Sequence, residues 1–371
     1  MRIAQVSPLL ESVPPQLYGG TERIVSYLTE ELVRQGHDVT LYASADSLTS
    51  ARLRPMCDRA LRLGDSLADP VAHHLLLLER VMREADTFDI VHFHLDYLPF
   101  SYIRHLGIPA LTTLHGRLDA SGLSPLFREY CDMHLVSISD AQRKPMPWAS
   151  WTATVHHGIP EHLYKQGDGK GGYLAFLGRI SREKRVDRAI EISRRVGIPL
   201  RVAAKIDTAD KTYYEESVRD LLCDSNVVFI GEIGEREKDD FLGNARALLF
   251  PIDWPEPFGL VIIEAMACGT PIIAFRGGSV EEIIEDGVTG FVVSNIEEAV
   301  EAVSNLDAID RSVCRARFEK RFGVSRMCHD YVSTYRRVLG HTASIHMNGH
   351  FKRHLPGALS SDELTATTER E

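Results

Sequence analysis

Residues Tyr173–Val196, YLAFLGRISREKRVDRAIEISRRV, show the alternation of apolar runs from which the fold class follows. Its apolar start predicts a short buried strand at Tyr173–Leu177. Gly178 then turns the chain, and after a basic loop the residues Val186–Val196 are typical of a helix. A short buried strand followed by a helix is the repeating unit of a parallel sheet covered by helices on both faces.

The same alternation extends along the chain in both directions. On the N-terminal side we expect a helix at Thr21–Gln35, stopped by Gly36, and strands at Arg2–Val6, Val39–Ala43, Ile90–Phe93, Ala110–Leu114, His134–Ile138 and Ala153–Val155. On the C-terminal side we expect strands at Leu200–Ala204, Val227–Ile230, Ala247–Phe250, Pro271–Phe275 and Gly290–Val293, and helices at Thr212–Leu222, Arg236–Leu242 and Gly259–Cys268 and then onward to about Gly340. The sequence therefore predicts an α/β protein.

A break in the alternation divides the chain. Residues 166–172 read QGDGKGG, and four glycines among polar neighbours are typical of a flexible linker or loop. Because 371 residues exceed the length at which a single core stops growing, we expect two domains, residues 1–166 and 173–324. Residues 341–371 lack periodicity and predict a flexible tail; a metal site at His350 and His354 is the weaker interpretation.

Composition and charge exclude several classes of protein. The net charge of −10 argues against a general nucleic-acid binder. No apolar run approaches the roughly 18 residues needed to cross a membrane, and the N-terminus is typical of a strand rather than a secretion leader. The six cysteines contain no C-x-x-C motif, which favours reduced thiols. We therefore expect a cytoplasmic protein.

The loop after the strand Tyr173–Leu177 carries the first candidate chemistry. Gly178, Arg179 and Lys184 stand between a strand end and a helix start, where open parallel sheets bind ligands and free N–H groups favour anions. A fork donor and a point charge suit a diphosphate. On charge alone, a solvated basic loop with Glu183 paired to a neighbour is slightly favoured.

A second candidate site follows the strand Ala247–Phe250, in the run Trp254–Pro271, WPEPFGLVIIEAMACGTP. Prolines on both sides stiffen Glu256 in an extended loop, and a helix with free N–H groups begins at Gly259. Glu264 lies among apolar neighbours in that helix, where a carboxylate needs hydrogen-bond donors. Two ribose hydroxyls would serve, and so would an ion pair, for example with Arg276.

Two weaker features belong to the N-terminal half. Gly19-Gly20 is a glycine turn before a helix, a geometry that lets backbone approach a phosphate or a sugar. His115 follows a strand and could face a cleft between domains. Taken alone, an ordinary loop and a structural histidine are the favoured interpretations.

His92, His94 and Asp96 alternate along one predicted strand and share a face. The spacing is similar to the start of some metallohydrolase sites, but Tyr97 stands where those sites place another histidine. We expect no metal here. Asp96 and Tyr97 are interpreted as strand-end residues that face an acceptor.

In this order along the chain, the features resemble the family 4 glycosyltransferases of the GT-B fold. Glu256 and Glu264 match the E-x7-E signature of that family. Its diphosphate-binding loop is similar to Gly178-Arg179 with Lys184, its glycine loop to Gly19-Gly20, and its cleft histidine to His115. The segments Leu114–Asp119 and Phe250–Glu256 look like the subgroup that contains an avilamycin-pathway glycosyltransferase.

The resemblance implies two Rossmann-like domains facing each other across a cleft, with residues 325–340 as a helix that crosses back to the N-terminal domain. It implies a nucleotide-sugar donor, UDP- or GDP-linked, held by the C-terminal domain. The implied catalytic residues are His115, Arg179, Lys184 and Glu256, and the implied donor-binding residues are Gly19, Gly20, Gly178, Glu232, Ile233, Phe258, Gly259, Leu260 and Glu264. Within this set Glu264 would bind the ribose and Glu256 the hydroxyls of the donor sugar.

The implied reaction is hexosyl transfer to a hydroxyl acceptor with retention of anomeric configuration. Because fixed cations would stabilise the leaving diphosphate, we expect neither a metal nor another cofactor. The alternatives are a GT-B nucleotide-sugar epimerase or hydrolase, a sugar-nucleotide sensor without turnover, and a metallohydrolase built on His92, His94 and Asp96. The oligomeric state is open.

Overall fold

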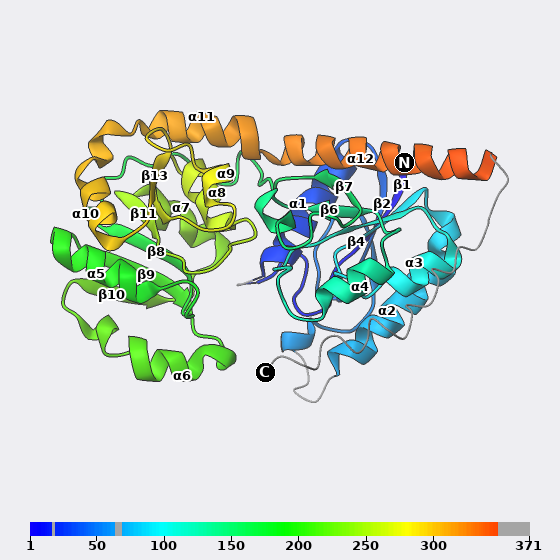
Figure 1. The fold of residues 1–371 in the computed structure, drawn as a ribbon, viewed down its shortest axis with the longest axis horizontal. Coiled ribbons are helices and arrows are strands. Elements are labelled where there is room, and N and C mark those ends of the chain that lie inside the picture. The colour runs from blue at the N-terminus through cyan, green and yellow to red at the C-terminus, as the bar shows by residue number, and fades with distance from the viewer. Residues whose placement is uncertain (17–18, 64–68, 348–371) are drawn as a thin grey trace, which may run out of the picture.

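The computed structural model describes residues 1–16, 19–63 and 69–347. It contains two α/β units that lie side by side along the long axis of the molecule (Figure 1). The N-terminal unit is a seven-stranded sheet in the order β3-β2-β1-β4-β5-β6-β7, and the C-terminal unit is a six-stranded sheet in the order β10-β9-β8-β11-β12-β13. Neighbouring strands pair in parallel in both sheets, which confirms the predicted α/β class.

The strands and helices have the following bounds. The N-terminal sheet contains β1 (Arg2–Val6), β2 (Asp38–Ala43), β3 (Arg52–Pro55), β4 (Ile90–Phe93), β5 (Ala110–Thr113), β6 (Leu135–Ser137) and β7 (Trp151–Thr154). The C-terminal sheet contains β8 (Leu174–Arg179), β9 (Leu200–Lys205), β10 (Val227–Gly231), β11 (Ala247–Phe250), β12 (Ile272–Phe275) and β13 (Gly290–Val293). The helices are α1 (Gly20–Arg34), α2 (Pro70–Glu84), α3 (Phe100–Leu106), α4 (Leu123–Glu129), α5 (Val186–Val196), α6 (Lys211–Tyr213), α7 (Lys238–Gly243), α8 (Leu260–Ala267), α9 (Val280–Ile283), α10 (Ile296–Ser304), α11 (Arg311–Phe322) and α12 (Val324–Met347).

Both sheets change winding direction next to their first strand. β1 lies between β2 and β4, and β8 lies between β9 and β11. In open parallel sheets, a crevice forms at such a switch point, beyond the carboxyl ends of the strands. The topology therefore places a crevice in each unit.

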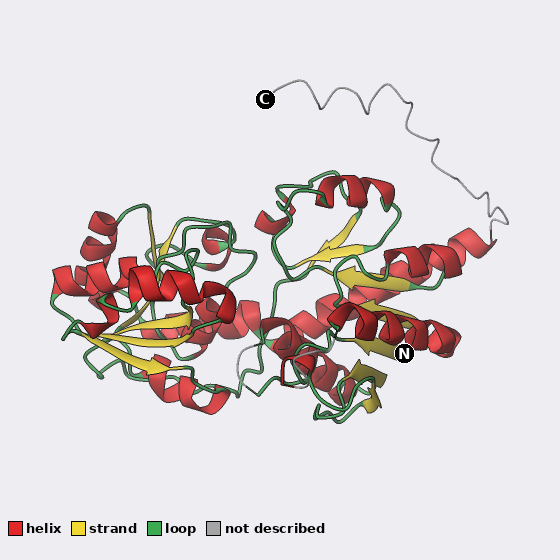
Figure 2. Cartoon of the chain, turned by 90° about the horizontal axis from the view of Figure 1, so that it is seen from below, coloured by secondary structure: helices red, strands yellow, loops and turns green. Residues whose placement is uncertain are grey.

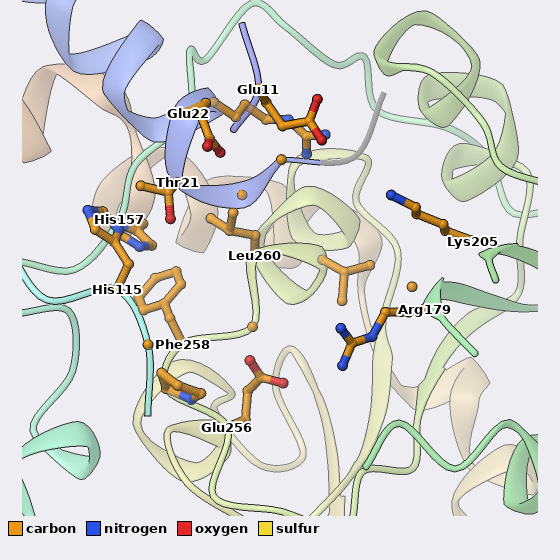
Figure 3. Close-up of a pocket in the computed structure, with 18 of the residues that line it drawn as sticks. Glu11, Thr21, Glu22, His115, His157, Arg179, Lys205, Glu256, Phe258 and Leu260 are labelled. Atoms are coloured by element: carbon orange, nitrogen blue, oxygen red, sulfur yellow. The ribbon is translucent and has the colours of Figure 1, made fainter. Parts of the chain in front are cut away.

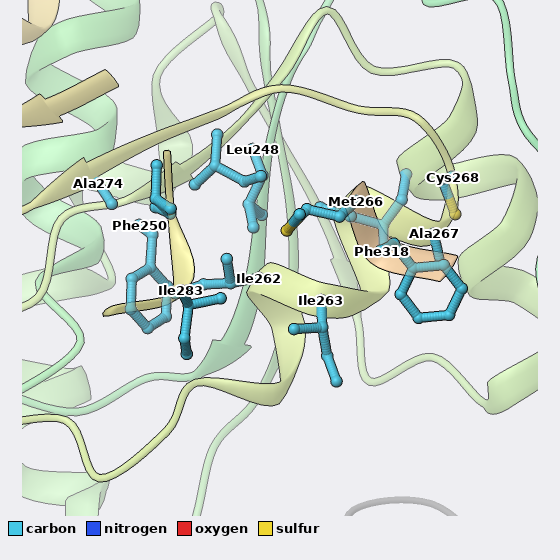
Figure 4. Close-up of a cluster of buried hydrophobic side chains, with 14 of the residues drawn as sticks. Leu248, Phe250, Ile262, Ile263, Met266, Ala267, Cys268, Ala274, Ile283 and Phe318 are labelled. Carbon is cyan, nitrogen blue, oxygen red and sulfur yellow. The ribbon is translucent and has the colours of Figure 1, made fainter. Parts of the chain in front are cut away.

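Helices bury apolar residues on both faces of each sheet (Figure 2). In the N-terminal unit, Ile24 and Leu28 of α1 pack with Tyr331 of α12 on one face, and Leu77 and Val81 of α2 pack on the other. In the C-terminal unit, α8 is buried between the sheet and α11. Figure 4 shows its side chains among those of the strands and α11, which include Leu248, Phe250, Ile262, Ile263, Met266 and Phe318.

The chain crosses between the units at two points that touch each other. The amide of Ile159 donates to Phe322 O at 3.0 Å, and the amide of Val324 donates to Ile159 O at 3.0 Å. After this second crossing, α12 packs along the N-terminal unit, whereas α11 lies over the C-terminal one (Figure 1). A side chain at Gly158 would lie 2.5 Å from Gly323 O, so the crossing needs glycine there.

Residues 166–172 form a loop, one of the two interpretations that their composition favours, and not a flexible linker. The amides of Gly167, Gly169 and Gly171 donate to Cys268 O, Gly243 O and Asn244 O at 3.0, 3.1 and 2.9 Å. A Cβ at Gly167 would overlap the backbone of Gly243. The glycines therefore allow this segment to pack closely on the C-terminal unit, and flexibility is the wrong interpretation.

Three other elements differ from the predictions. The edge strand β3 was not predicted, because Arg52-Leu-Arg-Pro55 offers a single aliphatic side chain and ends in proline. The predicted helix Thr212–Leu222 is instead a short α turn, a π-helical segment at Tyr214–Val218 and a 3-10 turn. α12 continues past Gly340 to Met347, so the predicted helix end is wrong, and His350 and His354 lie outside the described residues.

Within the described ranges, no helix has both the length and the apolar character that crossing a membrane requires.

Candidate active site

A pocket of about 680 Å³ lies between the two units (Figure 3). It is lined by loops that follow the carboxyl ends of strands in both sheets, as the switch points lead one to expect. Among the residues singled out from the sequence, those that line it are Gly19, Gly20, His94, Asp96, His115, Gly178, Arg179, Lys184, Glu232, Ile233, Glu256, Phe258, Gly259, Leu260 and Glu264. Tyr97 is exposed and does not line the pocket.

Arg179 ends β8 and points its guanidinium into the pocket (Figure 3). Its Nε lies 3.1 Å from Asp210 Oδ2 and its Nη2 lies 3.8 Å from Glu183 Oε2. Neither contact has hydrogen-bond geometry, so within the described residues the guanidinium donors make no hydrogen bond. The terminal Nη1 and Nη2 donors of Arg179 therefore stay available to a ligand, whereas Nε is buried beside Asp210.

Lys184 and Glu256 form an ion pair at the pocket wall. Trp254 Nε1 donates to the same carboxylate oxygen, Glu256 Oε2, at 3.0 Å. The Lys184 ammonium also lies 5.0 Å from the ring of Trp254, within cation–π range. The sequence analysis assigned Lys184 to the diphosphate of a ligand and Glu256 to its sugar. In the structure the charge of each side chain is balanced by the other.

A close backbone approach fixes the loop that carries Glu256. Gly278 has φ +57, and a Cβ there would overlap the backbone of Glu256. The next residue, Ser279, donates its amide to Glu256 O and its hydroxyl to Phe258 O, both at 2.9 Å. Sequence reasoning missed Gly278. The available signal was the pair Gly277-Gly278, one residue after the buried strand β12.

Glu264 is buried and ion-paired. Its Oε1 accepts from Arg23 Nη1 at 2.7 Å and from Lys238 Nζ at 2.8 Å. Burial alone would raise its pKa, but Lys238 and Arg23 hold the pKa of this carboxyl below its ordinary value. An ion pair was one of the two sequence interpretations. Its proposed partner was wrong, because Arg276 pairs with Glu281.

Arg23 links the two units across the pocket. It projects from α1 of the N-terminal unit to Glu264 on α8, and its Nε lies 2.9 Å from Glu235 Oε2. Tyr27, one turn further along α1, donates to the same oxygen of Glu235 at 3.1 Å. Arg23 and Lys238 were missed because neither stands in a recognisable motif.

His115 lies between two other histidines. Its Nε2 is 2.9 Å from His94 Nδ1, and its ring stacks on His157 with centroids 5.3 Å apart. Burial lowers the pKa of His115 to about 3 and those of His94 and His157 well below the usual value, so all three are neutral. His157 was missed by sequence reasoning, although it closely follows β7 as His115 follows β5.

The metallohydrolase interpretation of His92, His94 and Asp96 is wrong. Both ring nitrogens of His92 are bonded, to Tyr335 and Thr113, and both of His94, to Gln5 and His115. Asp96 lies beyond the strand end in a left-handed conformation, φ +50. Across residues 1–16, 19–63 and 69–347, no three His, Cys, Asp or Glu side chains are grouped as metal ligands would be.

Two carboxylates of the pocket were not anticipated. Glu22, in the first turn of α1, is 5 % exposed, and its burial raises its pKa to about 7. Glu11 is bonded to Arg62 at 2.8 Å, and burial raises its pKa as well. Both lie on the N-terminal side of the pocket, opposite Arg179 and Lys205 (Figure 3). The pocket thus has charges of both signs on each side, since Arg23 and Arg62 accompany Glu11 and Glu22, and Glu256 and Glu264 accompany Arg179 and Lys205.

Comparison with known proteins is consistent with this geometry. A Klebsiella pneumoniae protein described as an uncharacterized 41.2 kDa protein of the cps region is 30% identical over 178 residues, which are 44% of this chain and 46% of that protein. The chain thus spans less than half the length of this relative. Among solved structures, AviGT4, a glycosyltransferase of avilamycin A biosynthesis, is 24% identical with a TM-score of 0.68, covering 92% of this chain and 98% of its own. Anabaena Alr3699/HepE in complex with UDP and glucose is 17% identical with a TM-score of 0.72, covering 91% and 100%.

Two doubly wound units that face each other across such a pocket define the GT-B class of glycosyltransferases. The description "Glycosyltransferase Family 4" matches residues 18–154, and "Glycosyl transferases group 1" matches residues 164–312. The chain belongs to the family 4 glycosyltransferases. The likeness to AviGT4 shows the shared fold, and the narrower subgroup stays a prediction.

Proposed function

We propose that this protein is a retaining glycosyltransferase that moves a hexosyl group from a UDP- or GDP-sugar to a hydroxyl acceptor. The observation that carries the proposal is the placement of Arg179, whose guanidinium lines the same pocket as the Lys184–Glu256 pair. The presence of UDP in the related Anabaena structure supports a nucleotide donor.

The chemistry follows from where charge develops. When the bond between the anomeric carbon and the diphosphate oxygen breaks, negative charge builds on the diphosphate and positive charge on the sugar ring. Arg179 and Lys184 stabilise the first, and fixed donors of this kind contribute about 3–4 kcal/mol each to a transition state. Glu256 accepts hydrogen bonds from hydroxyl groups of the sugar and so orients the ring. When the donor binds, the Lys184 ammonium therefore contacts the diphosphate as well as the Glu256 carboxylate.

The ribose is assigned to Glu264, a carboxylate that already has two hydrogen-bond donors. Glu264 Oε1 already accepts from Arg23 and Lys238. Two ribose hydroxyls must therefore share this carboxylate with both cations or displace Arg23. Donor binding is thus linked to the contact between the two units.

Retention without a carboxylate nucleophile is the second part of the proposal. Glu256 and Glu264 are both engaged in ion pairs and serve as binding groups. The acceptor hydroxyl attacks on the face from which the diphosphate leaves, and a diphosphate oxygen takes its proton. Asp96, which lines the pocket on the N-terminal side, faces the acceptor. We place the reaction in the cytoplasm, because all six cysteines are free thiols.

A panel of UDP-, GDP-, ADP- and TDP-sugars tests the proposal. The correct donor raises the melting temperature, because it binds only the folded state. It then supports transfer to alcohol acceptors in the presence of EDTA, and NMR of the product shows the anomeric configuration of the donor. Epimerisation or hydrolysis without acceptor-dependent transfer would contradict the proposal, as would activity that EDTA abolishes and a divalent ion restores.

A further inference from the structure

A buried chain of hydrogen bonds runs from the pocket to α12. It begins with His115 Nε2, 2.9 Å from His94 Nδ1, and continues from His94 Nε2 to Gln5 Oε1, also 2.9 Å. Gln5 Nε2 then donates to the hydroxyl of Tyr335 at 3.0 Å. Gln5, His94 and Tyr335 are all fully or almost fully buried. These hydrogen bonds thus connect a residue of the pocket to α12, the helix that begins where the polypeptide crosses back to the N-terminal unit.

The same chain extends beyond Tyr335, away from the pocket. The Tyr335 hydroxyl lies 2.8 Å from His92 Nδ1, and His92 Nε2 lies 2.7 Å from Thr113 Oγ1. The Tyr331 hydroxyl, one turn before Tyr335 on α12, ends the chain 3.0 Å from Thr113 Oγ1. Between His115 and Gln5 the neutral imidazole of His94 has a partner on either side, so the direction of one of its bonds determines the direction of the other.

The direction can be worked out from Gln5. Its Oε1 can only accept, so His94 carries its proton on Nε2. His94 is neutral, so its Nδ1 has a lone pair, and His115 Nε2 must donate to it. His115 is neutral as well, which leaves its Nδ1 unprotonated. Among the described residues this Nδ1 has no hydrogen-bond partner, and the side chain lines the pocket.

Tyr335 is compatible with this direction on its other side. Its oxygen accepts from Gln5 Nε2, which leaves its own proton for His92 Nδ1. Turning the Gln5 amide around would reverse each bond, and His115 would then present an N–H to the pocket instead of a lone pair. The orientation of one buried amide therefore decides which kind of substrate group His115 can bind.

We propose that Tyr335, Gln5 and His94 are positioning residues that hold His115 with its proton on Nε2, so that His115 Nδ1 accepts a hydrogen bond from a substrate hydroxyl. This inference rests on the proposed function, in which the pocket holds a nucleotide sugar. It adds a specificity: the sugar presents a free hydroxyl to His115, and a sugar with hydrogen in its place loses the contact. Through Tyr335, α12 then influences substrate binding although it does not contact the substrate.

The direct test is the tautomer of His115 in the free enzyme. Histidine is labelled with 15N, and long-range proton–nitrogen correlation spectra distinguish protonated from unprotonated ring nitrogens. In the wild-type protein the Nδ1 of His115 is expected to be unprotonated and its Nε2 protonated. A protonated Nδ1 would overturn the proposal, and this measurement needs no variant.

Matched variants of α12 show whether the chain sets the tautomer. Tyr335→Phe removes the acceptor of Gln5, so His115 is expected to populate both tautomers, and kcat/KM is expected to fall about twofold, in proportion to the fraction of His115 left in the competent tautomer. Tyr331→Phe removes a hydroxyl from the same buried face of α12 but leaves Gln5 and Tyr335 bonded. It is expected to keep the wild-type tautomer and kcat/KM.

Gln5→Met keeps the length of the side chain and removes the amide, so it tests the same link if Tyr335→Phe does not fold. A single, unchanged His115 tautomer in Tyr335→Phe or Gln5→Met would overturn the proposal. The tautomer is read without substrate, so the two hypotheses can fail separately. A wild-type protein with the expected tautomer and no transfer from any nucleotide sugar would overturn the proposed function and leave the assignment of His115 standing.

Discussion

Arg23 Nη1 on α1 lies 2.7 Å from Glu264 Oε1 on α8, and this buried contact joins the two units across the pocket. The side chains are 11% and 3% exposed, so the pair is largely removed from water. It engages the carboxylate that the proposed function assigns to the ribose. Domain position and donor binding therefore depend on the same carboxylate group.

Arg23→Ala should loosen the contact between the units. Removing one partner of a buried ion pair costs about 3–5 kcal/mol, here reduced because Lys238 still neutralises Glu264. We expect a lower melting temperature and a larger radius of gyration by small-angle X-ray scattering. Arg34→Ala, on the same helix but paired within it to Glu31, is the control and should change neither. Wild-type values for both quantities in Arg23→Ala would contradict this role.

Arg179→Ala and Lys184→Ala should each lower kcat by about 10²–10³, because the leaving diphosphate loses a fixed cation. Circular dichroism should show a folded protein in both cases. Arg182→Ala is the matched control, since Arg182 is in the same loop but packs over Tyr213, outside the pocket. Near-normal turnover in both pocket variants would rule out the diphosphate role.

Gly278→Ala should displace the loop that carries Glu256. The new Cβ would overlap the Glu256 backbone, so we expect a large loss of kcat/KM together with a lower melting temperature. Gly287→Ala is the control, because Gly287 has a similar positive φ of +71 with nothing within 4 Å of its Cβ. It should lose stability by about 1 kcal/mol from backbone strain and keep its activity. Equal activity in the two variants would show that the close approach does not matter for the site.

Glu22→Gln should gain stability relative to the wild-type protein as the pH rises. The folded state raises the Glu22 pKa from 4.5 to about 7, so it binds more protons than the unfolded state between these values. The wild type therefore loses stability as the pH rises through this range, by up to about 3 kcal/mol at about 1.4 kcal/mol per pKa unit. Glutamine does not ionise.

The measurement for Glu22 is the difference in unfolding free energy between variant and wild type at pH 5 and pH 8. The difference removes the contribution of neutral buried histidines such as His115, which acts in the opposite direction, because their stability is lost as the pH falls below about 6.5. A difference that is the same at both pH values would contradict the raised pKa.

Local patterns predicted most of the fold. Ile90–Phe93, Val186–Val196 and Ala247–Phe250 form the strand, helix and strand that their apolar spacing indicates. The glycines of residues 166–172 were misinterpreted because composition cannot distinguish a glycine that frees the chain from one that lets Gly167 pack on Gly243. β3 was missed because an edge strand buries too little to need an apolar pattern.

The pocket residues were predicted where they stand in short motifs next to strand ends. Lys184 and Glu256 are examples, although their mutual ion pair was not foreseen. Arg23 and Glu264 are 241 residues apart, and nothing local in the sequence brings them together. Gln5 lies on an ordinary strand and Tyr335 on an ordinary helix, so their shared bond becomes visible only once α12 is seen to pack on β1 and its neighbours.

A crystal structure of the protein with the nucleotide sugar that stabilises it most tests the central claim directly. We expect density for the diphosphate between Arg179 and Lys184, for the ribose at Glu264 and for the sugar at Glu256, within the pocket between the two units. A nucleotide bound outside this pocket, or with its diphosphate beyond hydrogen-bond reach of both cations, would contradict it.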